Sequence, residues 1–250
     1  MKNFAILVTC GLMGLMVSSA DASVMLTASG YSATGDEVAF TAEVSISGDI
    51  LTVQLSNNSP VASNSRDDVL SSFYFDILNS AGLRPSLNYV SATGDVWMTS
   101  RNSADVLQTA DANLLADSSG DNTWQYKTMN AALMPFYGFG IGTVGNSGLG
   151  VNGFSGNVVD GVDYSIYTGE VLTQSLNGLL LVRGGATFTF SGATGFSDSD
   201  IKTSAIFGLG TGPDSLITGG GTNNIPEPAT AAMLVLGGVV ALARQRRMTV

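Results

Sequence analysis

The chain of 250 residues contains no histidine and a single cysteine, Cys10. Without histidine it can have no Ser-His-Asp triad and no imidazole base that titrates near neutral pH. Cys10 lies in an apolar N-terminal stretch that we expect to be removed. The mature protein would then have no thiol nucleophile, disulfide or thiolate zinc site. Stability must come from a hydrophobic core, and about 200 residues can bury enough surface to build one.

Basic residues are also scarce, since 10 Lys and Arg stand against 20 Asp and Glu. Four of the basic and two of the acidic residues lie in the two terminal segments, which leaves six against eighteen between them and a net charge of −12. Nucleic-acid binding requires clustered Lys and Arg. We therefore expect an acidic mature protein that does not bind nucleic acid.

The first 22 residues have the order of a secretory signal peptide. Lys2 supplies a positive charge, Phe4 to Val17 form an apolar stretch, and Ala20-Asp21-Ala22 forms an A-x-A site. Signal peptides are cut after such small residues. The pattern predicts export through the Sec translocon and cleavage after Ala22.

The last segment, 225–250, combines three features in a fixed order. Pro226-Glu227-Pro228 holds the backbone extended, because proline fixes φ and lacks an N–H. Residues 229–243 are fifteen residues without a charge, fewer than the roughly 20 of a typical span. Local membrane thinning and snorkelling arginines can close this difference. The arginines that follow favour the cytoplasm and are Arg244, Arg246 and Arg247. We predict a transmembrane helix over 229–243, with the bulk of the chain on the exported side.

This tail resembles the PEP-CTERM sorting signal of Gram-negative bacteria. The resemblance implies processing by exosortase, a membrane cysteine protease, and a route through an inner-membrane intermediate to the cell surface or the extracellular space. The alternative is a plain C-terminal anchor. A looser resemblance to a group of exosortase-dependent surface proteins implies architecture and export but no activity. It is carried by Leu55–Pro60, Asp68–Leu70, Phe73–Ile77, Trp124–Lys127, Tyr137–Gly140 and Val162–Tyr164.

Between the two ends, the apolar residues alternate with a period of two. Val38 to Ile46 and Leu51 to Leu55 read as two strands joined by a tight hairpin at Ser47-Gly48-Asp49. In Val69 to Ile77, Phe73, Phe75 and Ile77 share the core face, and Tyr74 and Asp76 share the other. Further strands are predicted at Ser86–Ser91, Thr123–Thr128, Phe136–Ile141, Val162–Tyr167, Leu179–Val182, Ala186–Ser191 and Ile201–Gly208.

These strands predict an all-β protein with one jelly-roll-like β-sandwich domain over 23–207, flanked by the signal helix and the transmembrane helix. Ser103 to Ala116 has apolar residues near helical spacing and is predicted as a short helix. Gly138 to Gly156 is interpreted as a long surface loop. Gly208 to Asn224 is dominated by Gly, Thr and Asn and is predicted to be a flexible linker before the tail.

Three groups of oxygen-bearing residues raise the question of calcium, which prefers oxygen ligands. They are Asp117–Asn122, Asp160–Asp163 and Asp198–Asp200. The first lacks the glycine and the glutamate of a helix-loop-helix calcium loop. Solvated turns rich in Asp explain all three, so we assign no metal and no cofactor.

The sequence also offers candidate residues for two kinds of carbohydrate site. A glycosidase needs two carboxylates at a set separation, and the candidates between the terminal segments are Glu37, Glu43, Glu170 and Asp76. No spacing pairs Asp76 with another residue, and a solvated strand face is the simpler interpretation. A sugar-stacking platform could use Trp97, Trp124, Tyr126 and Tyr137, which in a β-sandwich are more often core or edge residues.

The sequence therefore favours a non-enzymatic protein of the cell surface or the extracellular matrix, associated with exopolysaccharide or biofilm. Its expected partners are the Sec translocon, the membrane, exosortase and exopolysaccharide. The alternatives are a carbohydrate-binding module or adhesin on the same export route and, third, an acidic hydrolase.

Overall fold

A computed structural model of the protein describes residues 23–115, 123–129, 137–143, 162–171, 173–210 and 216–224. These residues form strands and two short 3-10 turns, and no α-helix. The strands are β1 (Ser23–Tyr31), β2 (Glu37–Ser47), β3 (Ile50–Asn57), β4 (Leu70–Phe75), β5 (Asn88–Met98), β6 (Val106–Asn113), β7 (Gln125–Thr128), β8 (Phe139–Gly142), β9 (Ile166–Tyr167), β10 (Leu180–Ser191), β11 (Ser204–Leu209) and β12 (Leu216–Asn224). The turns are η1 (Arg66–Asp68) and η3 (Asp198–Asp200). The all-β prediction is confirmed for this part of the chain.

The predicted hairpin is confirmed. In β2 and β3, Ser47 pairs with Ile50, so the loop has two residues, and Gly48 has a φ of +63°. This conformation favours glycine, which has no Cβ. The alternating apolar residues of both strands are buried as predicted: Val38, Phe40, Ala42, Val44, Leu51, Val53 and Leu55.

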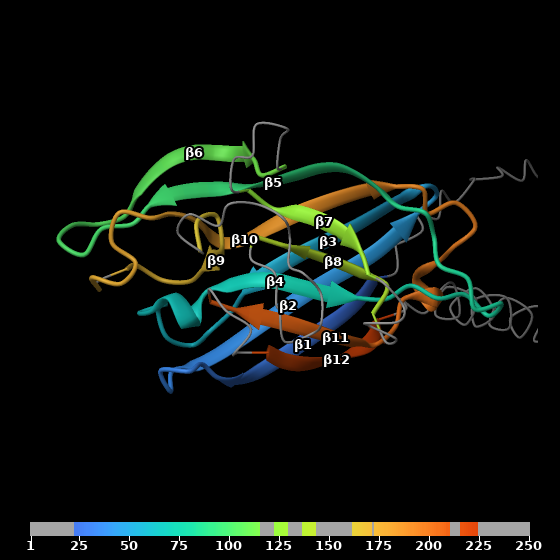
Figure 1. Ribbon diagram of the computed structural model, residues 1–250, viewed down its shortest axis with the longest axis horizontal. Helices are drawn as coiled ribbons and strands as arrows, with labels where there is room; N and C mark the ends of the chain where they lie inside the picture. The colour runs from blue at the N-terminus through green and yellow to red at the C-terminus, as the bar shows by residue number, and fades with distance from the viewer. Residues whose placement is uncertain are drawn as a thin grey trace, which may run out of the picture. The chain divides into compact units, whose positions relative to one another are not determined.

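The strands pair in the order β6-β5-β10-β3-β2-β1-β12-β11-β4-β8-β7, and β9 pairs with both β10 and β4. The eight strands from β10 through β1 to β4 and β9 therefore close into a barrel. The closing strand is short: β9 contributes two pairs to β10 and one, Ile166 with Leu70, to β4. Two further strand pairs continue the sheet, the β5-β6 wing beside β10 and β8-β7 beside β4 (Figure 1).

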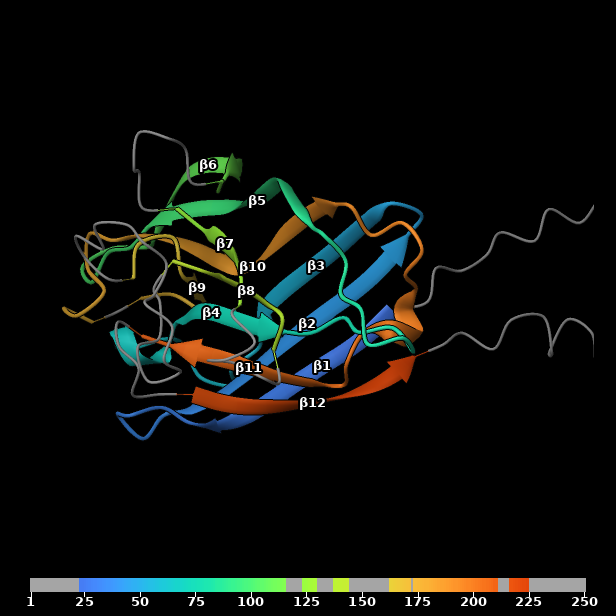
Figure 2. The same cartoon turned by 45° about the vertical axis from the view of Figure 1, so that its right-hand side comes forward.

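The core lies between opposite sides of this sheet. Figure 2 shows β4, β7 and β8 lying over β2, β3 and β10. Rings meet across the interior: Phe40 of β2 stacks on Phe207 of β11 at 6.0 Å between centroids, and Tyr126 of β7 lies 5.0 Å from Phe190 of β10. Burying each such large side chain contributes about 1.5–3 kcal/mol, so this interior is the main source of stability.

The prediction of a helix over Ser103–Ala116 is wrong. Val106–Asn113 is strand β6, paired with β5 at the edge of the sheet. The helical spacing did not mark a buried stripe, since Val106 and Leu107 are exposed and only Leu114 is fully buried. Asp111 has a φ of +47° at an irregularity of this pairing, which no regular helix contains.

The prediction of a flexible linker over Gly208–Asn224 is also wrong, and the β domain does not end at residue 207. Gly208 lies inside β11, and β12 is an inner strand between β11 and β1. Its glycines allow close packing. A Cβ on Gly219 would lie 2.7 Å from a ring carbon of Phe207, and one on Gly221 would lie 2.4 Å from Leu26. The glycine content that suggested a flexible linker instead reflects the close packing of this strand.

Other predicted strands exist with shifted bounds. Leu179–Val182 and Ala186–Ser191 belong to one strand, β10, whose pairing with β5 shifts between Val182 and Ala186. Of the strand predicted over Val162–Tyr167, only the last two residues form a strand, β9. Strand β1 was not predicted, although Val24, Leu26 and Ala28 alternate and are buried. Of the predicted loop Gly138–Gly156, residues 139–142 form β8, and those from 144 on lie outside the described residues.

Candidate functional site

The predicted sorting and processing residues lie outside the described residues. They are Ala20 and Ala22 at the signal cleavage site, Pro226, Glu227 and Pro228 of the sorting motif, and Arg244, Arg246 and Arg247 after the apolar run. The predicted helix over 229–243 falls in the same segment. No helix in the described ranges has the length and apolarity needed to cross a membrane.

The carboxylates weighed for glycoside hydrolysis do not come together as a pair. Glu37 and Glu170 are exposed, and Glu43 accepts a hydrogen bond from the Ser23 hydroxyl at 2.8 Å. Asp76 is buried rather than solvated, and the interpretation as a solvated strand face is wrong. Its two oxygens accept from Nε and Nη2 of Arg84 at 2.7 and 2.8 Å. A carboxylate held in a bidentate ion pair has a structural role.

The four aromatic residues do not form an exposed platform. Trp124 is fully buried against Phe188 and donates its Nε1–H to the carbonyl of Tyr164. Tyr126 packs on the same main core, whereas Tyr137 and Trp97 pack on two other clusters. The prediction that these residues take core or edge positions is confirmed: Trp124 is buried, and the other three are partly buried against the three clusters.

The Asp-rich turns also have structural roles where they are described. Asp200 accepts from the backbone N–H of Ser197 at the start of η3, and Asp198 accepts from the N–H of Ile46 in β2. Asp117–Asn122 and Asp160 lie outside the described residues. Among the described residues, no three His, Cys, Asp or Glu side chains gather as metal ligands would.

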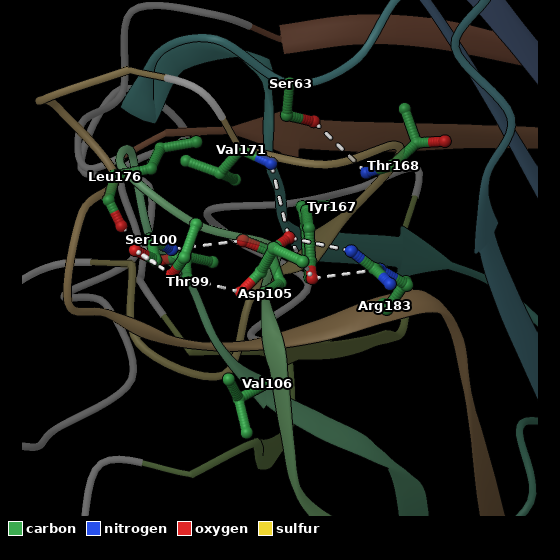
Figure 3. Close-up of polar contacts among 12 residues, drawn as sticks. Ser63, Thr99, Ser100, Asp105, Val106, Tyr167, Thr168, Val171, Leu176 and Arg183 are labelled. Carbon is green, nitrogen blue, oxygen red and sulfur yellow. Dashed lines mark hydrogen bonds and ion pairs between the residues drawn. The ribbon is translucent and has the colours of Figure 1, made fainter.

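One highly connected polar group was not predicted. Asp105, in the connection between β5 and β6, has a fully buried carboxylate. Its Oδ2 accepts from Arg183 Nη2 at 2.7 Å, the Tyr167 hydroxyl at 2.9 Å and the Val171 N–H at 3.2 Å. Its Oδ1 accepts from the N–H of Ser100 at 3.0 Å. Figure 3 shows these bonds converging on Asp105, which thereby ties β9 and β10 to the β5–β6 connection.

Arg183 is held on three sides. Besides its bond to Asp105, its Nε donates to the Tyr167 hydroxyl at 3.0 Å. Its guanidinium carbon lies 4.1 Å from the centroid of the Trp97 ring, a cation–π geometry. The side chain keeps 26% of its surface exposed. The signal in the sequence was the Arg183-Gly184-Gly185 interruption between two apolar runs, which is typical of a bulge.

The exposed side of Arg183 opens on a groove of about 400 Å³, called here the β10 groove. It is lined by Gln54 and Ser56 of β3, Thr93 and Asp95 of β5, Asp111 of β6 and residues 183–187 of β10. Gly184 has a φ of +77°, and a Cβ on Gly185 would lie 2.6 Å from the carbonyl oxygen of Leu55. The two glycines therefore allow the backbone irregularity that forms the floor. The groove lies within the roughly 300–1,000 Å³ typical of small-molecule sites.

Comparisons of this chain with protein-family models, with curated proteins and with solved structures find no match.

Burial also raises the pKa of several tyrosine hydroxyls near this site and in the core. It raises the pKa of Tyr89 and, together with the hydrogen bond to Asp105, that of Tyr167. In the unfolded chain tyrosine ionises near pH 10, whereas the folded protein keeps these protons to higher pH. The native state then binds more protons than the unfolded state, so stability falls as pH rises above about 10.

We therefore expect the free energy of unfolding, measured by urea titration, to drop steeply between about pH 10 and pH 12. The Tyr89→Phe variant should show a shallower drop, because one of the tyrosines that must ionise on unfolding is gone. An unfolding free energy that stays constant across this range would contradict the assignment.

Proposed function

We propose that this is an exported, non-enzymatic protein of the cell surface or the extracellular matrix, whose tail is a PEP-CTERM sorting signal processed by exosortase. On this proposal the partners are the Sec translocon, the membrane, exosortase and exopolysaccharide. We also propose that the closed sheet is a jelly-roll-like sandwich. The ring contacts between β2 and β11 and between β7 and β10 support that arrangement, because they join opposite sides of the sheet.

One observation carries the proposal: the folded sheet begins and ends where the two predicted processing segments meet it. β1 starts at Ser23, directly after the predicted cleavage site, and β12 ends at Asn224, one residue before Ile225 and the prolines. Ser23 and Asn224 are partners in the β1–β12 pairing. Removing both segments at the predicted positions would therefore take no residue from any strand that the structure describes.

The segment between β12 and the predicted membrane helix is short. Five residue steps separate Asn224 from Ala229, the first residue of the apolar run. Fully extended, they span about 17 Å. If the run is inserted in a bilayer, exosortase must act on a segment that is close in sequence to the folded domain.

Buried carboxylates support a non-catalytic role. Asp76 and Asp105 are each paired with an arginine, and Asp68 accepts from the N–H groups of Asn64 and Ser65 at 2.9 and 2.7 Å. Each carboxylate accepts hydrogen bonds from several donors that the fold holds in place, which suits a structural group.

The sorting proposal is tested by replacing Pro226 and Pro228 with alanine in a strain that contains an exosortase. Alanine would let helix continue into the segment that the prolines hold extended. We expect most molecules to remain in the inner membrane with the tail intact, as measured by cell fractionation and mass spectrometry of the C-terminus. The Thr230→Ala variant, which changes the tail but not the motif, should be processed like the parent. Equal processing of the proline variant, or of the parent in a strain without exosortase, would refute the proposal.

A further inference from the structure

The β10 groove presents donors on one side and acceptors on the other. Arg183 stands on one strand, and Asp95 and Asp111 stand on the β5-β6 wing. No ion pair within 4.0 Å joins Arg183 to either of these carboxylates. The neutral side chains between them, Gln54 and Thr187 among them, make no hydrogen bond to any other residue of the described chain. The groove therefore holds polar groups whose bonding capacity is open to a ligand.

Arg183 is already fixed in its binding position. Asp105, Tyr167 and the Trp97 ring hold its Nη2, its Nε and one face of its guanidinium plane. Its Nη1 donates to no atom in the described ranges. Because the side chain is ordered before a ligand arrives, little conformational entropy would be lost when Nη1 donates a hydrogen bond.

The acceptor side is also held in place. The backbone N–H of Asp111 donates to Oδ1 of Asp95 at 2.9 Å, which leaves Oδ2 of Asp95 and both oxygens of Asp111 available. Asp111 adopts a φ of +47°, a conformation uncommon outside glycine that is often found at functional sites. Asp111 is among the residues that line the groove.

These groups favour a neutral polyhydroxyl ligand. A sugar hydroxyl both donates and accepts, so one ring can accept from Arg183 and donate to Asp95 or Asp111. An anionic chain would meet two carboxylates in a protein of strongly negative charge, and a bare cation would meet the guanidinium. The lining has little apolar surface for a hydrophobic ligand.

The surface beyond the groove suits a ligand that is a chain. On the same face, the next row of residues across the strands is Ser45, Thr52, Thr189 and Ser91, which are direct partners in the pairings of β2, β3, β10 and β5. All four are partly exposed. A row of hydroxyl groups therefore continues from the groove across four strands.

We propose that the β10 groove binds a neutral oligosaccharide or polysaccharide chain through Arg183, Asp95 and Asp111. The site lies on described strands, so this inference does not require that the tail be a sorting signal.

The test is isothermal titration calorimetry of the full chain in mild detergent with cellohexaose, maltohexaose and N-acetylchitohexaose. At least one neutral hexasaccharide should bind. Thr187→Val and Asp111→Asn should each weaken binding by about tenfold, the effect of losing one good hydrogen bond. Thr93→Trp should abolish binding by filling the groove, whereas Thr27→Trp, on the outer face of β1, should leave it unchanged.

Three results would overturn the inference: no heat with any of the three sugars, binding that survives Thr93→Trp, or stronger binding of a galacturonate hexamer or of calcium chloride alone at this groove. Circular dichroism of each variant reports folding. The isosteric Thr187→Val change keeps the test decisive if the larger side chain disturbs the sheet. Calorimetry tests the groove, and the processing experiment tests the tail. A failure of the binding proposal is therefore distinguishable from a failure of the sorting proposal.

Discussion

Replacing Asp105 with asparagine is expected to lower the free energy of unfolding by about 3–5 kcal/mol, the range for breaking a buried ion pair by removing one partner. Four donors converge on this carboxylate: Arg183 Nη2, the Tyr167 hydroxyl and the N–H groups of Val171 and Ser100. Asparagine has the same shape but turns one acceptor into a donor and leaves the arginine without its counter-charge. Equilibrium unfolding in urea, followed by tryptophan fluorescence, measures the loss.

The matched control is Asp36→Asn, an equal change at a partly exposed aspartate in the β1–β2 turn, which should shift the unfolding free energy by less than about 0.5 kcal/mol. A second variant, Asp105→Asn combined with Arg183→Met, removes both charges. It should be less destabilised than the sum of the two single changes, because no unpaired charge remains. A small effect of Asp105→Asn alone, or strict additivity in the double variant, would show that the network contributes little.

This network matters because of where the barrel closes. β9 pairs with β4 through a single residue pair and with β10 through two. With so few backbone hydrogen bonds, β9 is held only weakly by strand pairing. Asp105 adds bonds to Tyr167 of β9 and to Arg183 of β10, and those bonds come from a third part of the chain. Closure of the sheet thus depends on side-chain hydrogen bonds as well as on backbone pairing between strands.

Local patterns predicted those parts of the fold that depend on local physics. The β2–β3 hairpin followed from alternation and one glycine, because both a period of two and a tight turn are properties of neighbouring residues. Phe73 and Phe75 of β4 were expected in the core and are buried. Tyr74 was expected on the opposite face and is buried as well, since Met129 and Ile206 pack against it there. The sequence of β4 alone does not predict that residues from other segments pack against its second face.

The candidate site could not be predicted for the same reason. Asp105 and Arg183 are separated by 78 residues, and neither stands in a motif. The β10 groove brings together Gln54, Thr93, Asp111 and Thr187, which lie on four strands that are neighbours only after the sheet forms. The sequence instead drew attention to its acidic turns and aromatics, whose structural roles are local caps and core packing.

The glycines of β12 led to the prediction of a flexible linker, but Gly219 and Gly221 occupy positions where close packing leaves no room for a larger side chain. We expect Gly219→Val to lower the free energy of unfolding by about 3 kcal/mol, the upper range for overpacking a core. A Cβ at this position would lie 2.7 Å from Cε2 of Phe207, which is fully buried, and 2.9 Å from the backbone oxygen of Thr27. The ring packs against Phe40 and Phe73, and the oxygen belongs to the paired strand β1.

The adjacent Gly220 is the control. A Cβ there would meet no atom within 4 Å, so Gly220→Val should be tolerated, and valine's preference for strands should make it neutral or slightly stabilising. Urea unfolding of the two variants side by side distinguishes a packed inner strand from a linker. A linker would accept valine equally at both positions. Only a strand held between β1 and β11, with one face against the core, rejects it at Gly219 and accepts it one residue later.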